Sequence, residues 1–115
     1  MRTRAGVKYS EAAELALQDL KGATDKPSAS IVRKVAATEL RLRADCQAGK
    51  VIKKSQIPTA LKNKYDSLEN LYKVKLSDFW RLLYTIIRDG SEVSVTILEI
   101  VDHDSYNKWF PSDHD

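Results

Sequence analysis

The segment 70–106 constrains the fold most, because apolar and polar side chains alternate along much of it. In its first run, Tyr72 and Val74 point to one side of an extended chain, whereas Lys73 and Lys75 point to the other. The first pair can join a hydrophobic core, and the second pair presents two ammonium groups. The alternation therefore predicts a β-strand with one apolar face and one cationic face.

A three-residue turn at 77–79 separates this strand from a second run, 80–87, in which Arg81 is the single charged residue. If the turn closes a hairpin, Lys75 lies opposite Arg81, and Lys73 lies on the same face. Three cations then share one face of the sheet. Like charges side by side repel each other, and a bound polyanion would offset that repulsion.

Turn and capping signals predict the remaining elements. Asp89-Gly90 between apolar runs is a strong hairpin signal, and a third alternating run, 93–97, follows it. Val7-Lys8-Tyr9 is a candidate for a short edge strand. Ser10 and the turn 25–28 supply capping groups for two helices with apolar stripes. The sequence therefore predicts an α+β chain in which a helical hairpin precedes a sheet.

A chain of 115 residues is long enough for one hydrophobic core and too short for two. We predict a single domain made of a helical hairpin over about 10–48, a basic linker over 49–64, a sheet over about 70–101 and a C-terminal tail over 102–115. The linker begins GKVIKKSQIP, whose glycine, lysines and proline disfavour continued helix. Its lysines, Lys50, Lys53 and Lys54, are candidate RNA contacts.

Charge is distributed unevenly along the chain. Residues 1–64 hold fourteen Lys and Arg against six Asp and Glu, whereas residues 65–115 hold five against ten. A basic half of this kind indicates a nucleic acid or an acidic protein as partner. A solvated helix face is the plainer explanation, so charge alone does not decide between them.

The sequence also bears on the compartment. No run approaches the roughly 20 apolar residues of a membrane helix, and the start MRTRAGVKY lacks the apolar core of a signal peptide. The lone Cys46 cannot form an internal disulfide, which fits a reducing compartment. We therefore expect a cytoplasmic protein with no membrane association.

Taken in order, two helices, YKVKL, a short loop, WRLLYTI, a DG hairpin and a Val/Ile strand followed by a polar cluster with a tyrosine resemble the RelE/ParE superfamily of toxin-antitoxin toxins. GKVIKKSQIP, LYKVKL, WRLLYTI and DHDSYNKWF are especially similar to archaeal RelE-type proteins. The resemblance spans nearly the whole chain. It implies an antiparallel sheet of about four strands packed against the helical hairpin, a cognate antitoxin as partner and, as in RelE, cleavage of mRNA on the ribosome. We expect no cofactor.

The resemblance also implies roles for individual residues. Lys73 and Lys75 match the two active-site lysines of a YKIKL-type strand. Arg81 matches the arginine of a YRLVY-type strand, and Tyr106 matches the C-terminal catalytic tyrosine. The family has a basic run before that tyrosine, whereas this chain has the acidic sequence DHD at 102–104. The second catalytic arginine is therefore missing, and His103 is the candidate substitute, because other members of the superfamily use a C-terminal histidine.

These residue types suit cleavage of RNA by its own 2′-OH. Arg81, planar and permanently charged, matches phosphate oxygens, and a lysine adds positive charge where negative charge develops. His103 is a natural proton carrier near neutral pH, and Tyr106 can stack on a splayed base or donate a proton. DNA lacks the nucleophile and would be a poor substrate.

Each candidate also has a structural explanation. The lysine pair can be solubilising surface residues, and Arg81 can form an ion pair with Asp78 or Glu99. The DHD sequence can cap a helix. Together with His114 it can be interpreted as a metal site, but no spacing fixes one and we predict none. The C-terminal aromatic residues can belong to a core or to a partner-binding surface.

Three functions of different class remain open. The first is an RNA- or ribosome-directed endoribonuclease toxin that an antitoxin restrains. The second is a ParE-like toxin that binds a topoisomerase and cuts nothing. The third is a binding module that keeps the fold without the activity. The two lysines and Arg81 favour the first over the second, whereas the acidic DHD sequence favours the third over the first.

Overall fold

The structure is a computed structural model that describes residues 4–111. The elements along the chain are β1 (Gly6–Tyr9), α1 (Glu11–Gly22), α2 (Lys26–Ala44), β2 (Lys50–Ile52), the short 3-10 helix η1 (Lys54–Gln56), α3 (Thr59–Lys64), β3 (Leu71–Lys75), β4 (Trp80–Asp89), β5 (Glu92–Asp102) and α4 (His103–Trp109). The strands form one sheet in the order β1-β5-β4-β3-β2. Neighbouring strands are antiparallel except for β1 and β5, which are parallel.

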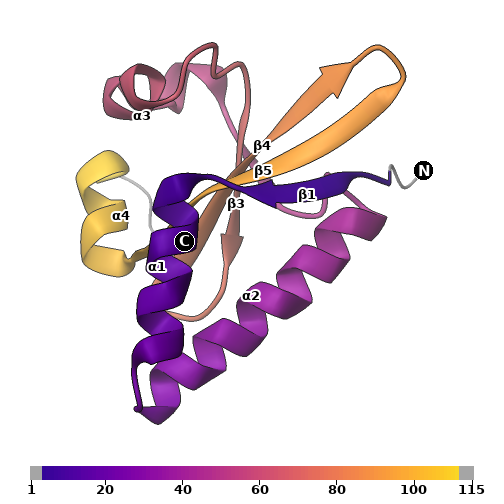
Figure 1. Cartoon of the computed structure of the whole chain (residues 1–115). Coiled ribbons are helices and arrows are strands. Elements are labelled where there is room, and N and C mark those ends of the chain that lie inside the picture. The colour runs from indigo at the N-terminus through magenta and orange to yellow at the C-terminus, as the bar shows by residue number, and fades with distance from the viewer. Residues whose placement is uncertain (1–3, 112–115) are drawn as a thin grey trace.

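The two helices of the hairpin begin at the predicted capping residues. The Ser10 hydroxyl accepts the Ala13 N–H at 3.0 Å, and the Asp25 carboxylate accepts the Ser28 N–H at 2.9 Å. These bonds satisfy backbone donors that a helix start leaves open. The buried apolar residues of both helices form one core cluster with residues of the strands. Figure 1 shows the two helices joined as a hairpin beside the sheet.

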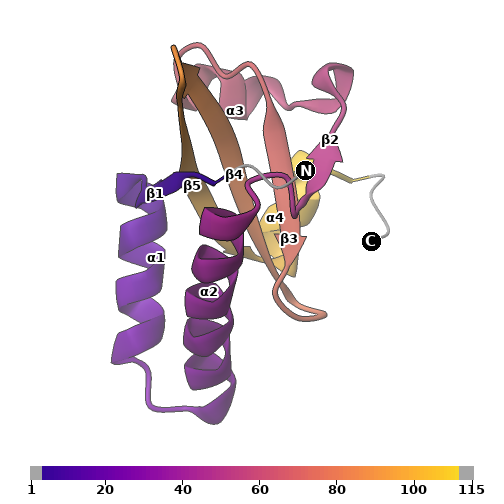
Figure 2. The same cartoon turned by 90° about the vertical axis from the view of Figure 1, so that its right-hand side faces the viewer.

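The sheet separates two hydrophobic clusters. On one face, strand residues such as Leu82 and Ile97 pack against α1 and α2. On the other face, Leu71 and Leu83 pack with α3 and with the end of α4. Figure 2 shows the α1–α2 hairpin on one side of the sheet and α4 on the other. The predicted cationic face of β3 is therefore partly covered by helices.

The predicted β3–β4 hairpin has the expected register, with Lys75 opposite Arg81 and Lys73 opposite Leu83. The turn after Asp89 places Gly90 in the left-handed region at φ 62°, which suits glycine.

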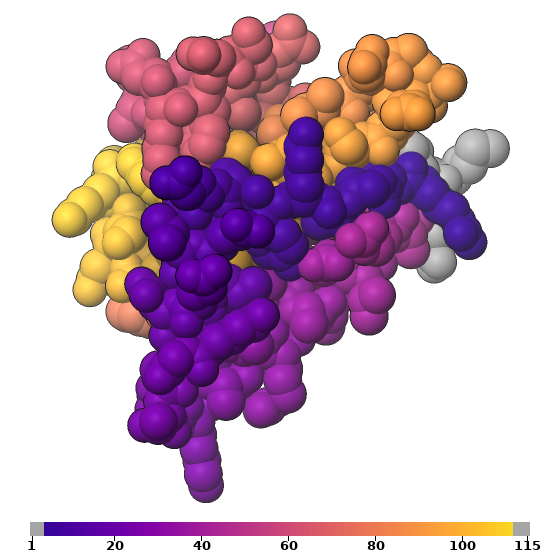
Figure 3. Space-filling model, in the orientation of Figure 1, coloured from indigo at the N-terminus to yellow at the C-terminus, as the bar shows by residue number. Residues whose placement is uncertain are grey.

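β1 is the predicted short edge strand. Figure 3 shows the end of the β4–β5 hairpin projecting at one corner of the molecule. Within residues 4–111, no helix is long and apolar enough to cross a membrane.

The sheet has five strands rather than about four, because part of the predicted linker pairs with the sheet. β2 runs antiparallel to β3, with Lys50 opposite Lys73. Gly49 permits this pairing, since its N–H donates to the Tyr84 hydroxyl at 3.0 Å and a Cβ at this position would stand only 2.7 Å from the tyrosine ring. Pairing across the sheet overrode local signals that favour a loop.

Candidate functional site

Three of the predicted site residues, Lys73, Arg81 and Tyr106, meet on the sheet face that α4 covers. The Lys73 ammonium nitrogen lies 5.8 Å from the centre of the Tyr106 ring, and the guanidinium carbon of Arg81 lies 5.7 Å from the same centre. The lysine comes from β3, the arginine from β4 and the tyrosine from α4. Both cations are thus within cation–π distance of one ring. We call these three residues the cation–tyrosine cluster.

The cation–tyrosine cluster is almost enclosed by protein. The exposed fraction is 6% for Lys73, 3% for Arg81 and 1% for Tyr106. Charged side chains are rarely this buried, because removing them from water is costly. A role as solubilising surface residue therefore does not describe Lys73. Enclosure also means that a polymer substrate cannot reach the Tyr106 side chain in this conformation.

Arg81 holds the loop between β3 and β4. One terminal nitrogen of its guanidinium donates to the carbonyl oxygens of Ser77 at 2.7 Å, Asp78 at 3.3 Å and Trp80 at 3.1 Å. Hydrogen bonds from an ionised donor are stronger than neutral ones. The arginine therefore has a structural role at the hairpin in addition to its position beside Tyr106.

The two acids considered as ion-pair partners of Arg81 bind other residues. Asp78 lies 3.4 Å from the ammonium group of Lys75, and Glu99 lies 2.7 Å from that of Lys64. Lys75 is on the same sheet face as Lys73. Its ammonium group turns toward Asp78 in the loop, and its side chain is half exposed. A surface pair of this kind contributes only about 0–1 kcal/mol, so Lys75 is easily released from it.

Glu99 is the centre of a separate polar network. It is 5% exposed and accepts hydrogen bonds from the Lys64 ammonium group and from the Tyr65 hydroxyl. Burial, followed by the hydrogen bond to Glu99, raises the pKa of Tyr65 well above its ordinary range. The network connects the end of α3 to β5. Glu99 lies opposite Leu83 of β4, so the network is on the same sheet face as the Leu83 side chain.

His103 is the first residue of α4 and lies beside the hairpin loop. Its Nε2 is 3.0 Å from the amide nitrogen of Asn107, and its ring centre is 6.2 Å from that of Phe79. Its Nδ1 is buried and has no hydrogen-bond partner within residues 4–111. His103 precedes Tyr106 by three positions, so the two side chains lie on the same side of the helix.

The helix-cap explanation of the DHD sequence is confirmed for its first residue. The Asp102 carboxylate accepts the Ser105 N–H at 2.9 Å, at the N-terminus of α4. His114 lies outside the described residues. Among residues 4–111, no group of three His, Cys, Asp or Glu side chains is placed to hold a metal ion.

Asp102 should therefore stabilise α4 and need not take part in chemistry. We expect Asp102→Ala to lower the free energy of unfolding by about 1 kcal/mol, because the capping bond is lost. Asp102→Asn keeps an acceptor oxygen at the cap and should lower it by at most a few tenths of a kcal/mol. Urea denaturation monitored by circular dichroism measures both. Equal losses for the two variants would contradict the capping role.

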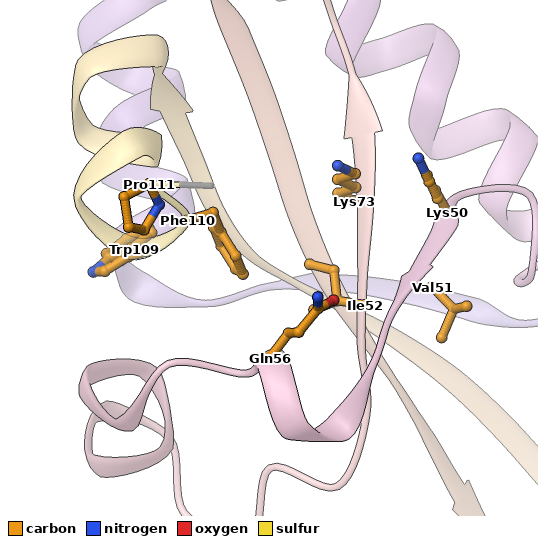
Figure 4. Close-up of a pocket in the computed structure, with 8 residues that line it drawn as sticks. All are labelled: Lys50, Val51, Ile52, Gln56, Lys73, Trp109, Phe110 and Pro111. Carbon is orange, nitrogen blue, oxygen red and sulfur yellow. The ribbon is translucent and has the colours of Figure 1, made fainter. Parts of the chain in front are cut away.

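A pocket of about 380 Å³ opens next to the cation–tyrosine cluster and is lined by Lys50, Val51, Ile52, Gln56, Lys73, Trp109, Phe110 and Pro111. Figure 4 shows the two lysines on neighbouring strands, with the aromatic residues at the end of α4. We call it the edge pocket. Of the predicted RNA contacts, Lys50 lines it, whereas Lys53 and Lys54 are exposed at η1 outside it. In the sequence, the C-terminal aromatic residues indicate a core or a partner-binding surface for Trp109, and no signal selects Gln56.

Comparison with known proteins identifies the fold. No protein-family model matches the sequence, and no curated protein is significantly similar to it. Among solved structures, a YoeB/ParE toxin from Agrobacterium tumefaciens has a TM-score of 0.60 and 12% identity, over 85% of this chain and 98% of that one. A double arginine-to-alanine mutant of the E. coli toxin RelE in the free state has a TM-score of 0.53 and 13% identity, over 95% of this chain and 93% of that one.

The chain has the RelE/ParE toxin fold. At 12% and 13% identity, the likeness establishes the arrangement of the elements and not the chemistry. Within the RelE/ParE fold, what this chain can do depends on its own side chains. Those that it brings together are Lys73, Arg81 and Tyr106, with Lys75 and His103 farther out along the same strand pair and helix.

Proposed function

We propose that the protein is the toxin of a toxin-antitoxin pair and that it cleaves mRNA on the ribosome in the cytoplasm. The observation that supports this most is the meeting of two cations and a tyrosine in the cation–tyrosine cluster, on a domain with the RelE/ParE fold. Two cationic side chains next to one tyrosine are suited to a phosphodiester, whose negative charge increases during cleavage.

In the proposed reaction, the 2′-OH of the RNA attacks the adjacent phosphorus atom. The bond to the 5′-oxygen then breaks, which leaves a cyclic 2′,3′-phosphate on one fragment and a 5′-hydroxyl on the other. Arg81 and Lys73 would stabilise the extra charge of the phosphorane, because both are cationic side chains that are almost enclosed by protein, where electrostatic attraction is stronger than in water. The Tyr106 hydroxyl would exchange a proton with the attacking or departing oxygen.

Lys75 and His103 have outer roles in this proposal. Lys75 would leave its weak pair with Asp78 and add charge at the phosphate. His103, one turn before Tyr106, would carry the second proton that the reaction needs. Lys53 and Lys54, exposed just beyond β2, would contact phosphates along the RNA or ribosomal RNA backbone.

Cleavage requires a rearrangement that exposes the cation–tyrosine cluster to RNA, because the cluster is nearly enclosed. The same enclosure favours a second candidate function, a binding module without activity.

The antitoxin belongs to the first proposal. α2 exposes Arg33, Lys34 and Arg41 around the apolar Leu40, and this surface suits an acidic amphipathic segment of an antitoxin.

The test is induced expression followed by primer extension on cellular transcripts. We expect slowed growth and new 5′ ends within translated messages, and Tyr106→Phe should reduce cutting at least about 100-fold, because it removes only the hydroxyl group. Tyr72→Phe is the matched control, since Tyr72 stacks on Tyr84 on the opposite face of the sheet. Co-expression of an acidic protein encoded beside this gene should restore growth.

If the wild-type protein neither slows growth nor cuts translated messages, the nuclease proposal should be abandoned. Co-purification of a partner without any cutting would support the binding module instead. Equal cutting by wild type and Tyr106→Phe would remove the tyrosine from the mechanism.

A further inference from the structure

The edge pocket is built from three separate parts of the chain. β2 and η1 supply Lys50 and Gln56, β3 supplies Lys73, and the end of α4 supplies Trp109 and Phe110. Its volume of about 380 Å³ is within the range of pockets that hold small ligands. A pocket with charged, amide and aromatic walls suits a ligand that has both an anionic group and a flat ring.

The cationic wall results from strand register. Lys50 and Lys73 are directly opposite each other in the β2–β3 ladder, so their side chains project from the same face of the sheet. Figure 4 shows both amino groups at the same end of the pocket. Two ammonium groups on one face of the sheet attract an anionic group, and the phosphate of a nucleotide is such a group.

The opposite wall is aromatic. Trp109 is half-buried and Phe110 is 7% exposed, and Phe110 is fixed by stacking on Tyr106 at 4.8 Å between ring centres. A fixed aromatic wall with an indole at its edge offers a surface on which a base can stack. Gln56 is exposed at the pocket and offers both a donor and an acceptor to the edge of a base.

We infer that the edge pocket binds one nucleotide of the RNA strand, with its phosphate between Lys50 and Lys73, its base on Trp109 and its base edge at Gln56. This inference rests on the proposed function. Lys73 belongs both to the edge pocket and to the cation–tyrosine cluster. A nucleotide held in the pocket would therefore set which neighbouring phosphodiester reaches Arg81 and Tyr106, and Gln56 and Trp109 would determine sequence preference.

Binding is tested first, without cleavage. The described chain has two tryptophans, Trp80 and Trp109, so two indole N–H signals in a proton–nitrogen correlation spectrum report on two places. Titration with adenosine 3′-monophosphate should shift the Trp109 signal and leave the Trp80 signal in place. Lys50→Gln should weaken binding about tenfold, and Trp109→Leu should weaken it by a similar factor when followed through the Gln56 amide signal.

Lys62→Gln is the matched control for Lys50→Gln, because Lys62 is exposed on α3 and does not line the pocket. Its affinity for the nucleotide should equal that of wild type. Inorganic phosphate should bind at least about tenfold more weakly than the nucleotide if the aromatic wall takes part. Equal affinity for the two, or shifts confined to Trp80, would overturn the inference.

Cut-site mapping then separates this inference from the proposed function. Gln56→Ala changes an exposed side chain and should leave the fold intact, and with Trp109→Leu it should alter the nucleotide preference around the cut. If the protein cuts RNA but both variants cut at unchanged sites, the pocket inference is wrong and the nuclease proposal stands. If the nucleotide binds but no RNA is cut, the nuclease proposal is wrong and the edge pocket remains a nucleotide site.

Discussion

Replacing Arg81 with alanine is expected to lower the free energy of unfolding by about 3 kcal/mol and to abolish RNA cleavage. The stability loss arises because alanine leaves a void at a residue that is 3% exposed and removes the donor to three loop carbonyls. Cleavage is lost because the phosphate loses its permanently charged partner. Urea denaturation and primer extension measure the two effects.

Arg81→Met separates structure from chemistry. Methionine fills most of the space of the arginine stem, and a buried charge is costly to hold, so we expect it to regain about half of the stability lost in Arg81→Ala. It should still be inactive. A methionine variant that cuts RNA as well as wild type would show that Arg81 only holds the β3–β4 loop.

The β3–β4 hairpin was predictable because its register depends on residues close in sequence. Alternation and a three-residue turn were enough to place Lys75 opposite Arg81. The caps at Ser10 and Asp25 were predictable for the same reason, since each bonds a backbone N–H three residues later. Local geometry leaves few alternatives at such positions.

Features that depend on distant contacts were not predictable. The lysines, glycine and proline around β2 are typical of a loop, whereas β2 forms because it pairs with β3. The preceding Gly49 also donates to the Tyr84 hydroxyl, 35 positions away in the sequence. The covering of the cationic face by α3 and α4 was missed for a similar reason. Nothing in the alternation of β3 indicates that Lys73 is enclosed while Lys75 is half exposed.

The candidate site illustrates the same division. The strand residues Lys73 and Arg81 were selected by pattern and by resemblance, and they lie together. Whether Tyr106 reaches them depends on how α4 packs, which involves the stacking of Phe110 and the cap at Asp102. The edge pocket depends on β2 and α4 together, so the sequence indicates its lysines, Lys50 and Lys73, but not that they share a pocket with Gln56 and Trp109.

Gly49→Ala is expected to lower the free energy of unfolding by about 2–3 kcal/mol and the melting temperature by about 10 °C. An added Cβ would lie 2.7 and 2.8 Å from two atoms of the Tyr84 side chain and 2.9 Å from the Lys73 carbonyl oxygen. The tyrosine cannot easily yield, because its hydroxyl donates to the Cys46 carbonyl at 2.7 Å and the side chain is fully buried. Thermal unfolding followed by circular dichroism measures the loss.

The same substitution should displace β2 from β3, since one of the close atoms belongs to the backbone of β3. Lys50 would then no longer face Lys73, so the edge pocket should lose nucleotide affinity even at temperatures where the chain stays folded. Gly22→Ala is the matched control, because a Cβ at the last residue of α1 meets nothing within 4 Å and alanine favours helix. Equal melting temperatures for the two variants would mean that Gly49 does not hold β2 against the sheet.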